Sequence, residues 1–154
     1  MPVILAICFM LISAGSYAQE DPPRPIAVSL ATGIEFGIFF HGPTGGTVVI
    51  SPDGTRTSTG DVFLVGFASS PLSFWIDANP GTIISMLPIP TITLTGSSGG
   101  SMTMDIDATN PVLPFPAPSP TTQFFLGGTL NVSNALANPP GYYSATFFVT
   151  FNQE

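Results

Sequence analysis

Residues 25–42 read PIAVSLATGIEFGIFFHG, and their alternation is the strongest fold signal in the chain. Every second side chain from Ile26 to Phe40 is apolar except Thr32, while the positions between them are mainly small or polar. A period of two residues is typical of a β-strand that buries one face. These 15 residues keep one phase, whereas a strand usually runs about 5–6 residues. The stretch predicts a β fold, with a strand that is too long to be buried within one small sandwich.

The sequence ATG at residues 31–33 offers a natural break in this stretch. In one interpretation the stretch is two strands in one phase. Residues 34–40 then begin the domain, and residues 19–33 form an extended N-terminal arm. In the other interpretation, a single first strand switches between the two sheets of a sandwich. The apolar side chains of the arm are Ile26, Val28 and Leu30.

Shorter alternating runs follow along the chain, separated by turns rich in Gly and Pro. They are VVI at 48–50, a strand resuming near 61, LSFWIDA at 72–78, TITLT at 91–95, SMTMDID at 101–107 and GTLNVS at 128–133. Strands at this spacing, with such turns, predict an all-β fold: an antiparallel immunoglobulin-like β-sandwich. The Pro-rich run at 110–120 predicts a stiff surface loop, because Pro donates no ladder hydrogen bond.

The stretch GYYSATFFVTFNQE, residues 141–154, predicts a terminal half-buried strand. Its alternating side chains are Tyr143, Ala145, Phe147, Val149 and Phe151. A sandwich that ends on this strand lacks a last strand, which a neighbour's arm could supply by β-strand addition. Burying three apolar arm side chains is worth about 1.5–3 kcal/mol each. That total is comparable with the whole stability of a small domain, about 5–15 kcal/mol.

Composition limits the compartment and the partners. Residues 1–18 are apolar and end in Ser-Tyr-Ala, which predicts a cleaved signal peptide and a domain over residues 34–154 after the arm. The protein is then expected in the periplasm or at the cell surface, without a transmembrane segment after leader removal. The only Cys, Cys8, lies in this leader, so no internal disulfide is expected. A net charge of −7 with no Lys excludes nucleic acid as a ligand.

The chain is poorly supplied with catalytic groups. His41 is the only His, and a Ser–His–acid triad would have to use it. Asp77, Asp105 and Asp107 are candidates for an acid–base pair, but the last two share one strand face and are expected to be solvated. Asn110 could join them around a calcium ion, yet no loop has the spacing of a calcium motif. We therefore expect a non-enzymatic protein without a catalytic, metal or cofactor site.

Two aromatic residues are candidates for sugar binding. Trp75 lies opposite in phase to Phe74 and Ile76. Exposed, Trp75 and Tyr142 would provide a stacking platform for sugar rings. Covered by a loop, Trp75 would be a core residue, which is the interpretation we favour.

Several stretches together carry a family resemblance: GIEFGIFFHGPTGGTVVISPDGTRTSTGDV, FWI, ISMLP, FFLGGTLNVS and GYYSATFFVTFN. Their order resembles the domain-of-unknown-function family 4402, a set of secreted bacterial β-sandwich domains, over nearly all of the mature chain. The resemblance implies fold and export, not a reaction. The PFPAPSP stretch departs from that family's pattern. The terminal strand and the arm are also similar to spore-coat-U and archaic chaperone–usher pilin domains.

The leading hypothesis is a secreted, non-enzymatic surface subunit of a pilus-like assembly. Its partners are like subunits or an assembly chaperone, and its arm is the donor strand. A complete sandwich with the arm folded onto its own body would count against this hypothesis. The alternative is a self-contained extracellular β-sandwich that binds glycans or other envelope components.

Overall fold

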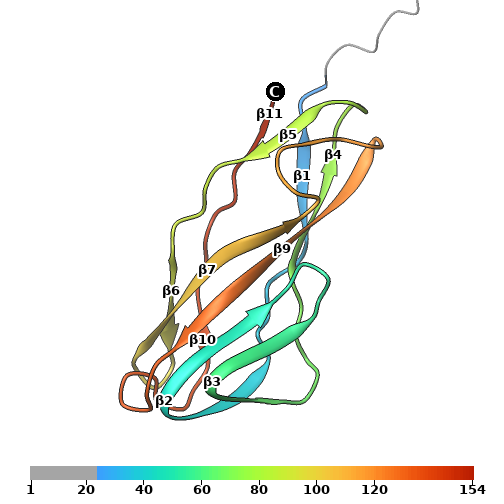
Figure 1. The fold of residues 1–154 in the computed structure, drawn as a ribbon. Helices are drawn as coiled ribbons and strands as arrows, with labels where there is room; N and C mark the ends of the chain where they lie inside the picture. The colour runs from blue at the N-terminus through green and yellow to red at the C-terminus, as the bar shows by residue number, and fades with distance from the viewer. Residues whose placement is uncertain (1–23) are drawn as a thin grey trace, which may run out of the picture.

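The computed structural model describes residues 24–154, and every regular element in this part of the chain is a β-strand (Figure 1). The strands are β1 (Ala27–Thr32), β2 (Ile38–Ile50), β3 (Arg56–Val65), β4 (Leu72–Asp77), β5 (Ile83–Met86), β6 (Ile92–Gly96), β7 (Ser101–Asn110), β8 (Phe115–Pro116), β9 (Thr121–Val132), β10 (Tyr143–Ser144) and β11 (Phe151–Gln153). The predicted signal peptide, Cys8 and residues 19–23 of the predicted arm lie outside the described residues.

The strands form a large and a small antiparallel sheet. In the large sheet the order is β1-β4-β9-β7-β6-β10, with β4 pairing to the first half of β9 and β2 to its second half. The outer partner of β2 is β3. The small sheet has the order β11-β5-β8. The predicted all-β, antiparallel fold is confirmed, and its immunoglobulin-like order stays a prediction. Among residues 24–154 there is no helix with the length and apolar character needed to cross a bilayer.

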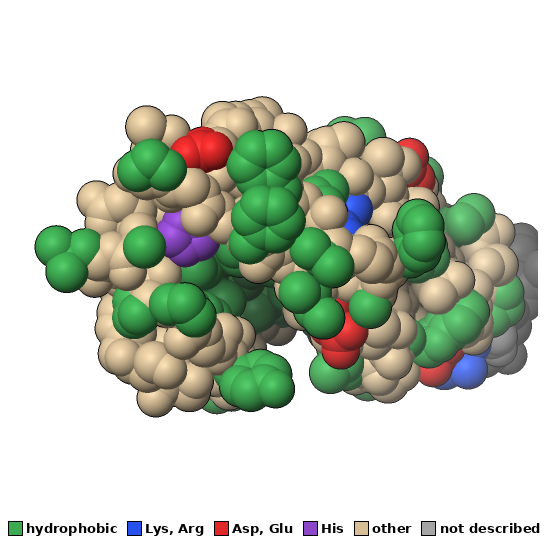
Figure 2. Space-filling model, turned by 90° about the horizontal axis from the view of Figure 1, so that it is seen from below, with side chains coloured by type: hydrophobic (Ala, Val, Ile, Leu, Met, Phe, Trp, Pro, Cys, Tyr) green, Lys and Arg blue, Asp and Glu red, His purple; other side chains and the backbone are tan. Residues whose placement is uncertain are grey.

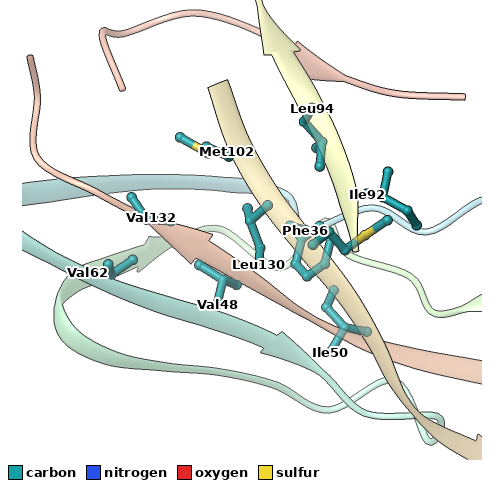
Figure 3. Close-up of a cluster of buried hydrophobic side chains, with 10 residues drawn as sticks. Phe36, Val48, Ile50, Val62, Ile92, Leu94, Met102, Leu130 and Val132 are labelled. Carbon is teal, nitrogen blue, oxygen red and sulfur yellow. The ribbon is translucent and has the colours of Figure 1, made fainter. Parts of the chain in front are cut away.

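Two hydrophobic clusters lie against the inner face of the large sheet, one on each half of β9. The buried members of the Phe124 cluster are Leu72, Phe74, Ile76, Ala78, Ile84, Phe115, Ala117, Phe124 and Leu126. The buried members of the Leu130 cluster, most of them drawn in Figure 3, are Phe36, Val48, Ile50, Val62, Ile92, Leu94, Met102, Met104, Leu130 and Val132. Both clusters use the even-numbered positions of β9, as the two-residue period of a strand requires.

The Phe124 cluster lies between two sheets. Phe124 is fully buried; Phe115 of β8 stacks on it at a ring-centroid distance of 5.7 Å, and Phe151 of β11 meets it edge-on at 5.4 Å. The Pro-rich loop therefore supplies an edge strand of the small sheet as well as a core residue. Pro116 is tolerated there because β8 pairs on one side only.

The Leu130 cluster is built differently. All of its strand residues belong to the large sheet, and the small sheet contributes none of them. Its remaining cover comes from segments without strand structure: Ile34 and Phe36, Ile89, and Phe147. This half of the molecule has no second sheet within the described residues.

The N-terminal stretch does not keep one phase through Phe40, so that prediction is wrong. β1 ends at Thr32 and β2 begins at Ile38, and Phe36 is buried while Ile38 and Phe40 are exposed. Gly37 has a φ of +72°, and a Cβ there would meet the Ala68 carbonyl. Only glycine fits such a position easily, and the turn that it makes reverses the face on which the alternation continues.

The predicted terminal strand is interrupted. β10 pairs with β6 and β11 pairs with β5, but residues 145–150 have no strand structure. The facing segment contains Pro88 and Pro90, which have no N–H to donate. An unbroken ladder from Ser144 and Thr95 would place Phe151 opposite Pro88, yet Phe151 pairs with Met86. The two ends of the segment are therefore out of register.

Candidate functional site

Residues 145–149, here called the terminal segment, pass close to both clusters. They run between β10 and β11 along the length of the molecule (Figure 1), and within the described chain they form no backbone–backbone hydrogen bond. The next residue is different, because the Thr150 carbonyl accepts a hydrogen bond from the Leu87 N–H at 2.9 Å. An extended segment with open N–H and C=O groups is a template for a further strand.

One end of the molecule has a hollow in its surface (Figure 2). Figure 2 shows the end of the molecule that carries β2, β3 and β10, where hydrophobic side chains surround a depression near His41, the purple side chain. Seven partly buried hydrophobic residues pack against the Leu130 cluster: Ile34, Phe39, Leu64, Ile89, Ile106, Tyr143 and Phe147. The Phe124 cluster has eight such residues, so partial burial does not separate the two clusters. The difference is that, within residues 24–154, no strand of the small sheet covers the Leu130 cluster.

The predicted terminal-strand residues behave unequally. Tyr143 and Phe147 pack against the Leu130 cluster, and Phe147, Val149 and Phe151 pack against the Phe124 cluster. Ala145 is exposed. The alternation of the sequence therefore identifies most of the inward positions, but it does not reveal the break. The signal that would have revealed it is the pair of prolines in the neighbouring LPIPT stretch.

The predicted arm lies on its own body. β1 is the edge strand beside β4, with Val28 opposite Ile76 and Leu30 opposite Phe74. Val28 and Leu30 therefore face the same side as the core, yet they remain 40% and 63% exposed. Ile26, in contrast, is partly buried against the Phe124 cluster. The backbone of this strand is paired, while Val28 and Leu30 keep much of their apolar surface exposed.

The two candidate sugar-binding aromatics are both exposed but lie far apart. Trp75 is 42% exposed on the outer face of β4, so the favoured core placement is wrong. Tyr142 is 88% exposed beside the turn after β6, where its N–H bonds to Ser97 Oγ at 3.0 Å. Because β9, β7 and β6 separate β4 from that turn, the two rings do not form one platform.

The polar candidate residues form hydrogen bonds with nearby groups and do not come together in one site. His41 lies within β2, with its ring nitrogens 3.1 Å from the carbonyl oxygens of Gly42 and Asn138. Asp105 accepts from the Thr91 hydroxyl at 2.6 Å, and Asp107 accepts from the Thr129 hydroxyl at 2.6 Å. Within residues 24–154, no three His, Cys, Asp or Glu side chains are grouped as a metal site requires.

Comparisons with known proteins place the chain in a family. No curated protein and no solved structure matches it. The model of one family, described as a domain of unknown function (DUF4402), matches residues 26–152, which include β1 as well as the body of the domain. A match over most of the 154 residues shows membership. The chain is a member of the DUF4402 family.

Proposed function

We propose that the protein is a secreted, non-enzymatic structural subunit of the cell surface that assembles with like subunits by donating a β-strand. The acceptor is the terminal segment beside the Leu130 cluster. The donor is the stretch from Ile26 to Leu30 of a neighbouring copy. The weaker similarity to spore-coat-U and chaperone–usher pilin domains is in keeping with this assembly mode.

One observation carries the proposal. Residues 145–149 have unpaired backbone directly over a cluster whose second layer contains no strand. A strand added here would gain main-chain hydrogen bonds from the terminal segment. Its alternate side chains would cover the partly buried residues of the cluster. A strand in this one position would therefore gain both the hydrogen bonds and the apolar contacts.

The arm is folded onto its own body, which counts against a free donor strand, so assembly requires an exchange of strands. The arm would give up its ladder with β4 and form another with the terminal segment, so the hydrogen bonds nearly cancel. The net driving force is then the apolar surface that Val28 and Leu30 newly bury, less the burial that Ile26 loses when it leaves the Phe124 cluster. Val28 and Leu30 are 40% and 63% exposed on their own body, and burying such side chains fully is worth up to about 1.5–3 kcal/mol each.

The first test compares two neighbouring arm residues. Val28 faces the core side and Ser29 faces outward, opposite Trp75. The full chain, with its leader, is expressed with Val28→Asp or with Ser29→Asp. Surface material is then sheared off and run on denaturing gels with and without boiling. We expect a heat-sensitive ladder of monomer multiples for the unmodified chain and for Ser29→Asp, and monomer alone for Val28→Asp.

A second test separates exchange from simple loss of fold. Ala27 and Asp77 are opposite each other on β1 and β4, and facing positions lie close to the separation that a disulfide spans. Ala27→Cys with Asp77→Cys locks the arm to its own body after oxidation. The locked chain should stay monomeric and should assemble after reduction, with each single Cys variant as control. Assembly of the locked chain, or equal loss in both aspartate variants, would contradict the proposal.

A further inference from the structure

The outer face of β4 carries an aromatic ring and a carboxylate close together. Trp75 and Asp77 are two residues apart and point away from the buried Phe74 and Ile76. Two residues of strand separate them by about 7 Å. Trp75 is the only Trp in the chain and is 42% exposed.

Neighbouring strands add polar groups to this pair. Gln123 of β9 lies opposite Trp75 in the sheet register. Thr121 lies opposite Asp77, and its hydroxyl donates to the Asp77 carboxylate at 2.5 Å. This bond fixes the carboxylate while leaving most of its acceptor positions open, since a carboxylate has about four lone-pair sites.

A surface depression adjoins the carboxylate. Its lining includes Arg24, Pro25, Ala27, Asp77, Pro120 and Thr121. The guanidinium of Arg24 is oriented there by its Nε, which donates to the Asn79 side-chain oxygen at 3.0 Å. The depression thus offers a donor and an acceptor of opposite charge, next to an exposed indole ring.

We propose that this surface, the Asp77 depression with Trp75 and Gln123, binds a neutral sugar unit of an extracellular polysaccharide. The flat apolar face of a sugar ring suits stacking on an indole. Adjacent hydroxyls donate to the Asp77 carboxylate and bond to the Gln123 amide, and a few placed polar groups of this kind fix orientation.

Charge selects a neutral ligand. The chain has no Lys and a net charge of −7. The other Arg, Arg56, donates to backbone carbonyls of Phe36, Val65 and Gly66, away from this surface. A single Arg beside a carboxylate gives no excess positive charge for an anionic glycan, and like-charge contacts are costly.

Further polar side chains lie on the outer face of the same strand. Thr129 and Asn131 are at outward positions of β9, about 20–26 Å from Gln123 at the rise of a strand, with Phe125 and Gly127 between them. Thr129 bonds to Asp107, and the Asn131 amide bonds to Asp105. A chain of sugars long enough to reach Thr129 and Asn131 would gain these polar partners, so we expect oligosaccharides to bind more tightly than single sugars.

This site belongs to the unassembled chain, because strand exchange would take part of its lining away from β4. Arg24, Pro25 and Ala27 belong to the arm, so the depression is complete while β1 pairs with β4, as it does in the monomer. The test therefore uses the purified monomeric chain. Failure of sugar binding would leave the strand-exchange proposal standing, and failure of exchange would leave this site intact.

The emission of the single Trp reports directly on the site. Cellohexaose, maltohexaose and mannohexaose are titrated as neutral probes, with hexagalacturonate as the anionic comparator. We expect a saturable emission change with at least one neutral hexasaccharide and none with the anionic one. No change with any neutral probe, or a change with hexagalacturonate alone, would overturn the proposal.

Variants identify the residues, with binding followed by calorimetry. Asp77→Ala and Gln123→Ala should each weaken binding by about tenfold, the usual effect of losing one such hydrogen bond. Trp75→Ala should abolish detectable binding. Tyr142→Ala is the matched control, an exposed aromatic at the other end of the sheet, and should bind as the unmodified chain does. An equal loss in Tyr142→Ala would contradict the assignment, provided that both variants keep the unmodified urea midpoint.

Discussion

The Phe124 and Leu130 clusters rest on one strand, β9, but they are closed in different ways. The Phe124 cluster is closed by the small sheet, whose strands are tied to each other by ladder hydrogen bonds. The Leu130 cluster is closed by linking segments, and the terminal segment among them has no ladder at all. Two clusters of similar apolar content can therefore differ in rigidity. A covering segment that has no ladder hydrogen bonds can shift, or another strand can replace it.

The largest expected effect is in the closed half. Phe124 has no exposed surface and touches Phe115 and Phe151 from the small sheet. Phe124→Ala should lower the free energy of unfolding by about 3–5 kcal/mol, the usual cost of a cavity of this size. Urea denaturation of the monomer measures it. A loss below about 1 kcal/mol, far under that cavity cost, would mean that the small sheet does not hold this half closed.

Two leucines on β9 test the comparison directly. Leu126 belongs to the Phe124 cluster and Leu130 to the Leu130 cluster, and both are buried. Each Leu→Ala change should cost between about 2 and 5 kcal/mol, with the larger loss at Leu126. The reason is that the unladdered cover over Leu130 can relax into the cavity. Equal losses of stability, or a larger loss at Leu130, would contradict the claim that the cover of the Leu130 cluster is the less rigid one.

The open half relies on a hydrogen-bonded clamp as well as on packing. The buried Asn138 amide donates to the Ser101 carbonyl, and its oxygen accepts from the Ser133 N–H, both at 2.5 Å. Asn138→Ala leaves two backbone groups unpaired and should cost about 2 kcal/mol. Asn138→Asp keeps the acceptor but buries a carboxylate whose second oxygen faces the Ser101 carbonyl, so it should cost at least as much when measured by urea denaturation at neutral pH. The opposite ranking would contradict the clamp.

Arg56 should have a smaller effect on the same half. Its guanidinium donates to the carbonyls of Phe36 and Gly66 at 3.0 and 2.6 Å, which ties the link carrying Phe36 to the loop after β3. Arg56→Lys keeps the charge but loses the fork geometry, so we expect a loss of about 1 kcal/mol. Arg24→Lys is the matched control and should change the urea midpoint less. An unchanged midpoint in Arg56→Lys would show that the link is held by packing alone.

The smallest effect lies outside both clusters. The Thr55 N–H donates to Asp53 at 2.9 Å, and this bond lowers the pKa of the Asp53 carboxyl below its ordinary value of 3.8. A lowered pKa in the folded state gives stability that is present above pH 3.8 and lost as pH falls through the folded pKa. Asp53→Asn should therefore flatten the acid side of a urea-midpoint profile slightly. A steeper profile would reverse the sign of this linkage.

Much of the fold could be predicted from alternation. The stretches LSFWIDA, TITLT and SMTMDID mark β4, β6 and β7, because one buried face per strand leaves a period of two in the sequence. The prediction of one phase in the N-terminal stretch was wrong because Gly37 changes which face of the strand is buried, and the apolar pattern of the sequence continues across it. The prediction of one unbroken terminal strand was wrong because the prolines that interrupt it lie in the facing segment, at Pro88 and Pro90.

The candidate sites, too, could be predicted only in part from the sequence. The sequence could identify Val28 and Leu30 as inward-facing and Trp75 as opposite in phase to its neighbours, since phase is local. It could not place Trp75 on an uncovered face, because that depends on which segments pack over β4. Nor could it join Arg24 to Asp77, which lie far apart in the sequence and meet only at the sheet edge.

By itself, the sequence determined that this protein is all-β, antiparallel and built without Lys. Those properties follow from side-chain types and from a period that each strand carries alone. Only the tertiary structure decided that, among residues 24–154, one half of β9 has a second sheet above it and the other half does not. That outcome depends on long-range register and on which strands the remaining backbone can reach, and no single stretch of residues encodes it.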